Sequence, residues 1–456
     1  MRYILCMENS VKQPRFTSAA LKKLILPLML EQFLLVLVGL ADSVMVASCG
    51  EASVSGVSLV DSVNILLIQV FAALATGGAV VASQYLGRKD NDNASRAAKQ
   101  LLWISVLIAL VVSAVAVLGD SVILRFVFGN VDAEVMEAAS TYFWISALSY
   151  PFLALYNAGA ALFRSMGNSR VSLWVSMLLN VINIIFNSLF IFGLHWGVAG
   201  AALASLLGRA AAGIIMVVLL HSPRNSICLT KVYKPEFKAT MLQSILKIGV
   251  PNGLENGMFQ VGKLLVASLI ATFGTAAIAA NAICNSIGSL SNVPGSALGL
   301  AILPVVGQCV GAGDYEDARY YTRKIMKISF TLLGVVAVAL FFATPALVGI
   351  YQVSAEASSL AVITLQVFFI CNIFFWPQSF VLPNALRGAG DAKFTMTVSI
   401  LSMWIFRIGC SYLLGSYFGM GLLGVWIAMV IDWVVRGICF VVRFRGSKWN
   451  KKAVID

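Results

Sequence analysis

The sequence predicts an all-α polytopic membrane protein with twelve transmembrane helices in two pseudo-symmetric six-helix lobes. Its composition is one reason: 59% of the 456 residues are hydrophobic, 11% are charged, and the mean hydropathy is +0.89. Apolar runs recur along the chain at about the twenty-residue length that a helix needs to cross a bilayer core. The other reason is an internal repeat.

The repeat relates residues that lie 224 positions apart. The matched pairs are Pro27 and Pro251, Leu30 and Leu254, Glu31 and Glu255, Gly50 and Gly274, Ala52 and Ala276, Gln84 and Gln308, Gly87 and Gly311, Asp90 and Asp314, and Ala94 and Ala318. A constant offset over about seventy residues indicates a duplicated helix bundle.

The apolar runs place the twelve crossings in order. The predicted ranges are 22–47, 54–84, 97–118, 136–163, 171–193 and 197–220, followed by 245–272, 277–309, 325–348, 356–386, 395–417 and 420–442. A polar stretch separates the halves, which predicts an N-terminal lobe at 1–220, a cytoplasmic linker at 221–244 and a C-terminal lobe with a basic tail at 245–456. With six crossings each, the repeats are parallel and enclose a cavity around an axis along the membrane normal.

The basic residues predict the orientation. Of 32 Lys and Arg residues, 28 lie in segments on one side, Arg125 alone lies on the other, and three lie inside helices. This positive-inside pattern predicts a multi-pass protein of the plasma (inner) membrane with both termini in the cytoplasm. The dispersed charge also argues against a nucleic-acid partner, which would need a clustered basic face.

No catalytic motif accompanies the helices. The eight cysteines are scattered without a CxxC pair, and the two histidines have no partner at metal-ligand spacing. We therefore expect a protein that is not an enzyme and has no cofactor.

Ionisable residues inside the crossings are the strongest functional signal. They are the acids Glu31, Asp42, Asp61, Glu255 and Asp432 and the bases Arg209, Lys263 and Arg407. Each costs at least about 2.5–3.5 kcal/mol at a helix centre, so several of them are expected to form an ion or substrate pathway. The three bases are candidate counter-ions for the acids, and Asp61 and Asp432 receive no specific role.

Glu31 and Glu255 are the strongest candidate pair of functional acids, because each follows the proline of its helix, Pro27 or Pro251, by four residues. At equal depth in the two lobes, they are predicted to face each other across the axis and to bind protons and a lipophilic cation. The alternative is that they accept hydrogen bonds from neighbouring helices.

Asp42 lies eleven residues after Glu31, on the same helix face and about 16 Å further out, which suggests an outer ion site. A helix-end aspartate that reaches the interface is the alternative. Asn180, Asn183 and Asn187 form one polar stripe on the fifth crossing. The stripe either supplies oxygen ligands or holds helices together.

Six segments carry a resemblance to a known family. They are ILPLMLEQFLLVLVGLADSVMVAS, SQYLGRKDNDNASRAAKQ, GQCVGAGDYEDARYYTRK, ALFRSMGNSRVS, ALRGAGDAKFT and NVINIIFNSLFIFGLHWGVAGAALAS. Over nearly the whole chain, the sequence resembles the multidrug and toxic compound extrusion (MATE) family, prokaryotic branch. The resemblance implies export of organic, often cationic, drugs in exchange for protons or sodium ions, as two lobes rock between outward-open and inward-open states.

The resemblance also implies roles for single residues. Asp42 matches a first-helix aspartate of a cation site, and Pro27 matches a proline at which that helix bends; Pro251 is the mate of Pro27. Asn183 matches the family's fifth-helix asparagine, while Asn187 stands where relatives typically have an aspartate. Ser205 keeps the hydroxyl of a sixth-helix threonine, and Glu255 resembles an acid on the seventh helix.

These matches lead to an ion-coupling set of Asp42, Asn183, Asn187 and Ser205, with no metal beyond a sodium ion at Asp42. Losing one carboxylate weakens a sodium site more than a proton site, yet the choice of coupling ion stays open. Expected partners are small organic substrates and the lipid bilayer, with a monomer as the working unit.

Two other functions compete with this one. A flippase for lipids or lipid-linked oligosaccharides would share the fold, but its cavity should be rich in Arg and Lys, whereas buried acids here outnumber bases five to three. A receptor or scaffold would not explain paired buried glutamates at equal depth.

Overall fold

The computed structural model describes residues 15–129, 131–230 and 236–455, without the side chains of residues 40–44 and 47. The first half contains α1 (Ser18–Ala47), α2 (Glu51–Gly87), α3 (Asn91–Leu118), α4 (Asp120–Phe128), α5 (Ala133–Leu148), α6 (Tyr150–Ser165), α7 (Ser169–Asn187), the π-helical η1 (Ser188–Gly193) and α8 (Gly197–Leu220). The second half contains α9 (Ala239–Ala271), α10 (Thr275–Gly311), α11 (Tyr315–Gly349), α12 (Ala355–Trp376), η2 (Pro377–Val381), α13 (Leu382–Gly388), α14 (Ala392–Ser402), η3 (Met403–Ile408), α15 (Gly409–Ser411), η4 (Tyr412–Tyr417), α16 (Gly421–Arg445) and the 3₁₀ turn η5 (Lys448–Lys451).

Each predicted crossing corresponds to one helix or one end-to-end helix run of the described chain, so the predicted fold class is confirmed. Nine of the described helices are long and apolar enough to span a membrane. α5 and α6, bent by 50° at their junction, add a tenth when the pair is taken as one span, while α1 and α9, which carry the buried glutamates, correspond to the other two predicted crossings.

Several repeated residues serve to start helices. Asp90 and Asp314 cap α3 and α11, and each side chain accepts a hydrogen bond from the backbone N–H three residues later, at 3.0 and 3.1 Å. Gly50 and Gly274 precede α2 and α10 with φ of +100° and +96°, a conformation that side-chain-bearing residues rarely adopt. The duplication thus preserved the turns that set helix length.

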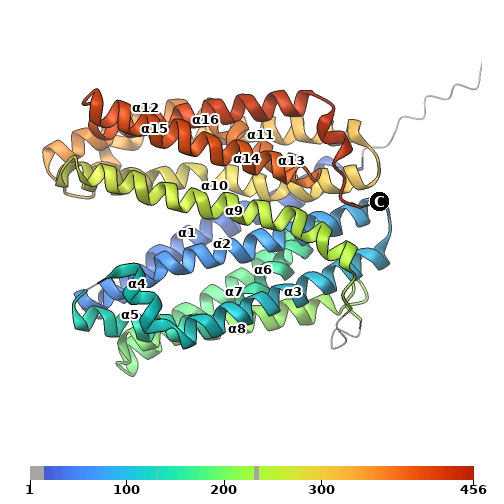
Figure 1. Ribbon diagram of the computed structural model, residues 1–456, viewed down its shortest axis with the longest axis horizontal. Helices are drawn as coiled ribbons and strands as arrows, with labels where there is room; N and C mark the ends of the chain where they lie inside the picture. Colours follow the sequence, from blue (N-terminus) through green and yellow to red (C-terminus); the bar gives the residue numbers. More distant parts are fainter. Residues whose placement is uncertain (1–14, 130, 231–235, 456) are drawn as a thin grey trace, which may run out of the picture.

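The two halves lie side by side along the long axis of the molecule (Figure 1). Between them, α1 packs against α10, α9 packs against α2, and α2 packs against α10. The first helix of each half therefore contacts the second helix of the other half, as a twofold relation requires.

The C-terminus marks one end of the long axis (Figure 1). We call this end the basic end, because it gathers the Arg- and Lys-bearing segments 88–99, 164–170, 319–327, 387–393 and 443–452. The opposite end carries Gly50 and Gly274.

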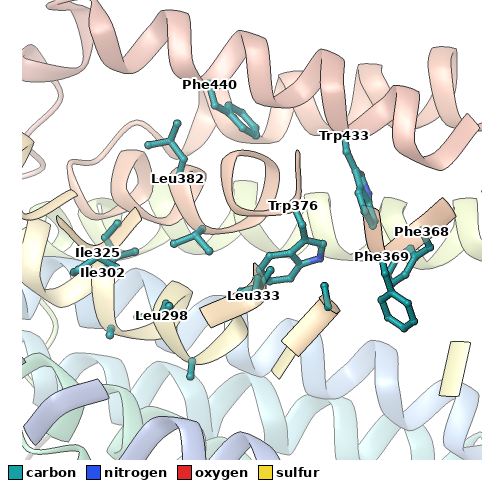
Figure 2. Packing of buried hydrophobic residues seen from close by; sticks show 14 of the residues in the cluster. Leu298, Ile302, Ile325, Leu333, Phe368, Phe369, Trp376, Leu382, Trp433 and Phe440 are labelled. Atoms are coloured by element: carbon teal, nitrogen blue, oxygen red, sulfur yellow. The ribbon is translucent and has the colours of Figure 1, made fainter. Parts of the chain in front are cut away.

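Aromatic packing holds the second half together. Figure 2 shows Trp433 of α16 above Phe368 and Phe369 of α12, with Trp376 nearby. The rings of Phe368 and Trp433 pack edge to face with centroids 5.7 Å apart. This core fixes α16, which carries Asp432 and part of a cavity wall.

Candidate functional site

Glu31 lies on α1, one turn after Pro27, and only 3% of it is exposed. Its carboxylate accepts a hydrogen bond from the Ser172 hydroxyl of α7 at 2.7 Å. Arg164, at the end of α6, lies 3.7 Å from the other carboxylate oxygen and also donates to Ser172 at 3.2 Å. The charge of Glu31 is therefore compensated inside the first half.

Glu255 on α9 has an equivalent arrangement in the second half. Arg387 of α13 donates to its Oε1 at 2.7 Å and also donates to Asn384 at 2.7 Å. The other carboxylate oxygen, Oε2, is buried and accepts no hydrogen bond from the described residues. A buried carboxylate paired in this way is not a free anion in a cavity.

The two arginines are repeat mates that directly follow the predicted crossings 136–163 and 356–386, in the basic segments expected on the inner side. Arg164 ends the segment ALFR and Arg387 ends the shorter copy ALR, so they lie 223 residues apart. The repeated motif was the available signal for their role. From their equal depth, Glu31 and Glu255 were expected to face each other, whereas the structure gives each glutamate an arginine partner from its own half.

Three residues of the predicted ion-coupling set lie together. Asn187 donates to the side-chain oxygen of Asn183 at 3.0 Å, and Asn183 donates to the Ser205 hydroxyl on α8 at 3.0 Å. Asn183 and Asn187 are buried, and the side-chain oxygen atoms of the three residues are of the kind that could serve a small cation or a proton chain. Asp42 lies on α1, which packs along α7, but its side chain is outside the described part of the chain.

The three helix-borne bases have different surroundings. Arg209 donates to the Ser149 hydroxyl at 2.7 Å, near Asp61, which accepts a long hydrogen bond of 3.4 Å from Asn64. Tyr150 donates to the same asparagine at 2.7 Å. This polar cluster joins α2, α6 and α8.

Arg407 belongs to a second cluster around Asp432, whose side chain is fully buried. Arg407 and Arg436 each lie 4.0 Å from a carboxylate oxygen of Asp432, and the Ser402 hydroxyl donates to it at 2.6 Å. With two arginines and one acid, the cluster carries a net positive charge. Lys263 has no carboxylate within 4.0 Å among the described side chains.

A cavity of about 440 Å³ lies between the halves, away from the basic end. Its walls come from Ser62, Ile65, Leu66, Gln260, Lys263, Leu264, Val266, Ala267, Ile270, Asn281, Asn285, Ser289, Arg407, Val425, Trp426 and Met429. Among these lining residues, the charged ones are both cationic. Within the described residues, no group of three His, Cys, Asp or Glu side chains could hold a metal ion.

The halves are sealed to each other at the basic end. Gln84 of α2 donates to the Gly388 carbonyl at 3.1 Å, and its repeat mate Gln308 of α10 donates to the Ser165 carbonyl at 2.7 Å. We call this pair of contacts the basic-end gate. Each gate carbonyl belongs to the residue directly after a paired arginine, Arg164 or Arg387.

Glycines permit the close crossing of α2 and α10 at this gate. A Cβ atom on Gly87 would overlap the Gln308 carbonyl, and one on Gly311 would overlap the Gln84 carbonyl. Arg15 adds hydrogen bonds to the Gln308 and Gly87 carbonyls at 2.6 and 3.1 Å. In the sequence, Gln84, Gly87, Gln308 and Gly311 stand out only as landmarks of the repeat.

The sequence model of the MatE family matches residues 27–189 and 251–413. The two matches are separated by the same 224 residues as the repeated landmarks. The duplicated segments are thus two copies of one family unit.

Curated relatives match along nearly the entire chain. The sequence is 29% identical over 465 residues to the "uncharacterized transporter YisQ" of Bacillus subtilis, with 100% of both chains covered. It is 28% identical over 445 residues to the "probable multidrug resistance protein NorM" of Thermotoga maritima, covering 95% of this chain and 93% of that one.

Solved structures share the fold. A MOP superfamily transporter from Pyrococcus furiosus, described as having a binding pocket of reverse polarity, has a TM-score of 0.87 at 22% identity, with 93% and 94% of the two chains covered. An outward-facing multidrug resistance MATE family transporter has a TM-score of 0.88 at 22% identity, with 95% and 96% covered. At this identity the similarity shows the fold alone.

Proposed function

The chain belongs to the MatE family of membrane transporters, and we propose that it is a secondary active exporter of organic compounds. The exported compounds are drugs and other xenobiotics, and protons or sodium ions flowing inward drive their release. Relatives named as probable multidrug resistance proteins support this proposal. It includes a plasma-membrane location with the basic end and both termini in the cytoplasm, and a monomer as the working unit.

The observation that carries the proposal is a closed basic end combined with a cavity toward the other end. The basic-end gate joins the halves through Gln84 and Gln308, while the cavity separates them beyond it. Because the halves are repeats, a rocking motion can open one end as it closes the other. This arrangement supports alternating access, with the described state closed to the cytoplasm.

The coupling ion is proposed to bind near Asp42, Asn183, Asn187 and Ser205. The hydrogen-bonded row from Asn187 to Ser205 supplies neutral oxygen atoms, and Asp42 would supply the charge. Sodium would use several of these oxygens at once, whereas a proton needs only the carboxylate. Each inward-moving charge gains about 2.3 kcal/mol per 100 mV of membrane potential.

Glu31 and Glu255 are proposed to act on the gate through their arginines. Arg164 and Arg387 each precede a carbonyl that a gate glutamine binds, so their position helps to set that carbonyl. Protonation of a glutamate would remove the counter-charge of its arginine and weaken that support. Proton uptake would thereby favour opening of the cytoplasmic side. This role replaces direct pairing of a substrate cation with either glutamate.

A flippase for lipids or lipid-linked oligosaccharides is a second candidate, because of one observation. The cavity presents Lys263 and Arg407, the kind of residues that hold a phosphate group. The cavity volume of about 440 Å³ lies in the range of small-molecule sites, which favours export of drug-sized compounds.

The test is transport by the purified protein in proteoliposomes. Fluorescent organic cations and anions would be loaded, and a pH gradient or a sodium gradient would be imposed separately. We expect uphill movement of at least one compound with one of the gradients, and none in protein-free liposomes. Movement of labelled lipids alone would favour the flippase, and no gradient-dependent flux of any probe would contradict both proposals.

A further inference from the structure

We propose that the cavity binds its substrate through an anionic group, a carboxylate or similar oxyanion on a compact aromatic body, held by Lys263 and Arg407. This inference rests on the proposed export function and names its substrate class. The substrate would be an organic anion or a zwitterion rather than a simple lipophilic cation.

The cations of the cavity lack sufficient counter-charge. Asp432 lies 4.0 Å from Arg407 and equally far from Arg436, so one carboxylate is shared between two arginines beyond hydrogen-bond distance. Only 8% of Arg407 is exposed. Its Nε atom is buried and has no hydrogen-bond acceptor among the described residues. A buried guanidinium donor without an acceptor favours an oxyanion beside it.

Lys263 and Arg407 contact the same aromatic side chain and line the same cavity. Both cationic groups lie over the ring of Phe259, at 5.3 and 5.2 Å from its centroid. The aromatic face offsets part of their repulsion, but two neighbouring cations attract an anion more strongly than either would alone. A cationic substrate would be repelled at the same place.

The buried glutamates do not cancel these charges. Glu255 precedes Lys263 by eight residues on α9, about 12 Å along the helix, and it is bound to Arg387. Glu31 is bound to Ser172 and lies beside Arg164. Each acid is compensated near the basic end, so the positive charge of the cavity persists.

The remaining wall suits an aromatic body. Trp426 donates to the side-chain oxygen of Asn281 at 3.2 Å and packs edge to face on Phe368, with centroids 5.2 Å apart. Its indole is therefore held in place beside Met429, Val425 and the cations. A planar ring has apolar surface to contact here, while its anionic substituent reaches the guanidinium and the ammonium.

The experiment compares two radiolabelled aromatic probes of opposite charge, p-aminohippurate and tetraphenylphosphonium, on the purified full-length protein. Binding is measured by scintillation proximity, and flux is measured in proteoliposomes. Lys263→Gln should weaken p-aminohippurate binding by about tenfold, the usual cost of losing a charge-assisted contact. Tetraphenylphosphonium binding should stay equal or become tighter.

Lys263→Arg serves as the conservative variant and should retain p-aminohippurate binding. Arg125→Gln removes one exposed cation from α4, outside the cavity, and should leave both affinities unchanged. Lys263 is exposed, so its replacement is not expected to unfold the protein. Arg407 is buried, so its replacement is a less suitable test of binding.

Ion-driven flux of tetraphenylphosphonium without any p-aminohippurate binding would overturn this inference and leave the export function standing. Binding of p-aminohippurate that Lys263→Gln weakens, without flux of any probe, would support the anion site and contradict the export function. Movement of a labelled anionic phospholipid that Lys263→Gln reduces, with no p-aminohippurate binding, would assign the anion chemistry to a lipid head group and overturn the small-substrate assignment.

Discussion

Glu31 and Glu255 are repeat mates with ion pairs of different strength. Arg387 bonds directly to Glu255 at 2.7 Å, whereas Arg164 lies 3.7 Å from Glu31 and Ser172 makes the short contact. The side chains of Glu255 and Arg387 are each only 11% exposed. Removing one partner of such a pair leaves an uncompensated buried charge.

Glu255→Gln should therefore lower the free energy of unfolding by about 3–5 kcal/mol and abolish export. Glu31→Gln should cost less, because Ser172 can still bond to the amide. Thermal unfolding in detergent would measure both changes. The double variant Glu255→Gln with Arg387→Gln should be more stable than the sum of the two single losses predicts; strict additivity would argue against the pair.

Asn187 stands where the family resemblance implies an aspartate. Asn187→Asp would add a second carboxylate to the row that ends at Ser205 and should strengthen sodium binding, because sodium prefers several charged or carbonyl oxygens. We expect a larger share of sodium-driven flux in proteoliposomes. Asn180→Asp, about two turns away on α7, is a matched control; equal flux changes in both variants would contradict a specific ion site.

At the scale of helices, the crossing of α2 and α10 decides whether the basic end is closed. The crossing depends on two glycines that let each helix approach a backbone carbonyl of the other, and on two glutamines that bridge to the ends of α6 and α13. One glutamine and one glycine recur at equivalent positions in each half, which makes the closure symmetric.

Gly311→Ala should disturb this crossing, because the added methyl group would overlap the Gln84 carbonyl. We expect faster maleimide labelling of the buried Cys309 from the basic side, in a background without other cysteines, together with lower thermal stability. Gly257→Ala on α9 is the control, since its methyl group would meet no atom within 4 Å and should stabilise the helix by up to about 1 kcal/mol. Equal labelling in both variants would count against the gate.

The cap of α3 predicts a pH dependence. Hydrogen bonds from the backbone N–H and the side chain of Asn93 lower the pKa of Asp90 below its ordinary value of 3.8. Because the pKa is lowered on folding, the stabilisation is present above pH 3.8 and is lost as the pH falls through the lower, folded value. Asp90→Ala should cost about 1 kcal/mol at neutral pH. Melting curves of the variant and the wild type should converge in strong acid; a constant gap would contradict the cap.

At the scale of the whole molecule, the C-terminal segment joins the halves at the basic end. Trp449 is buried in the second half and stacks on Phe444 with centroids 5.4 Å apart. Beyond it, the Val454 N–H donates to Gln84 at 3.0 Å, and its carbonyl accepts from Ser244 of α9 at 2.9 Å. The segment thus hydrogen-bonds to Gln84, one of the two gate glutamines.

Truncation after Lys451 removes the contacts of Val454 and keeps the anchor at Trp449. We expect easier opening of the basic end, seen as faster labelling of Cys309 and a higher flux rate at the same driving gradient. Val454→Pro removes the donated N–H and should act in the same direction. Unchanged labelling in both variants would mean that the segment does not restrain the gate.

The fold was predictable from the sequence because its signals lie along the chain. Apolar runs predict the twelve crossings, and the constant offset that relates Glu31 to Glu255 indicates the duplication without any tertiary contact. The polar row of Asn183, Asn187 and Ser205 was also predictable, since helical spacing and the family resemblance both indicated it.

The partners of the buried charges depended on tertiary structure. Arg164 and Arg387 lie beside basic turns, so the sequence suggested solvated loop residues, but their long side chains reach back to the glutamates. The excess of acids suggested a cavity suited to cations, yet packing compensates Glu31 and Glu255 and leaves Lys263 and Arg407 on the wall. The sequence by itself determined which segments cross the membrane, because hydropathy and repeats are properties of neighbouring residues. Only the packing of distant helices decided which charges remain exposed to a substrate.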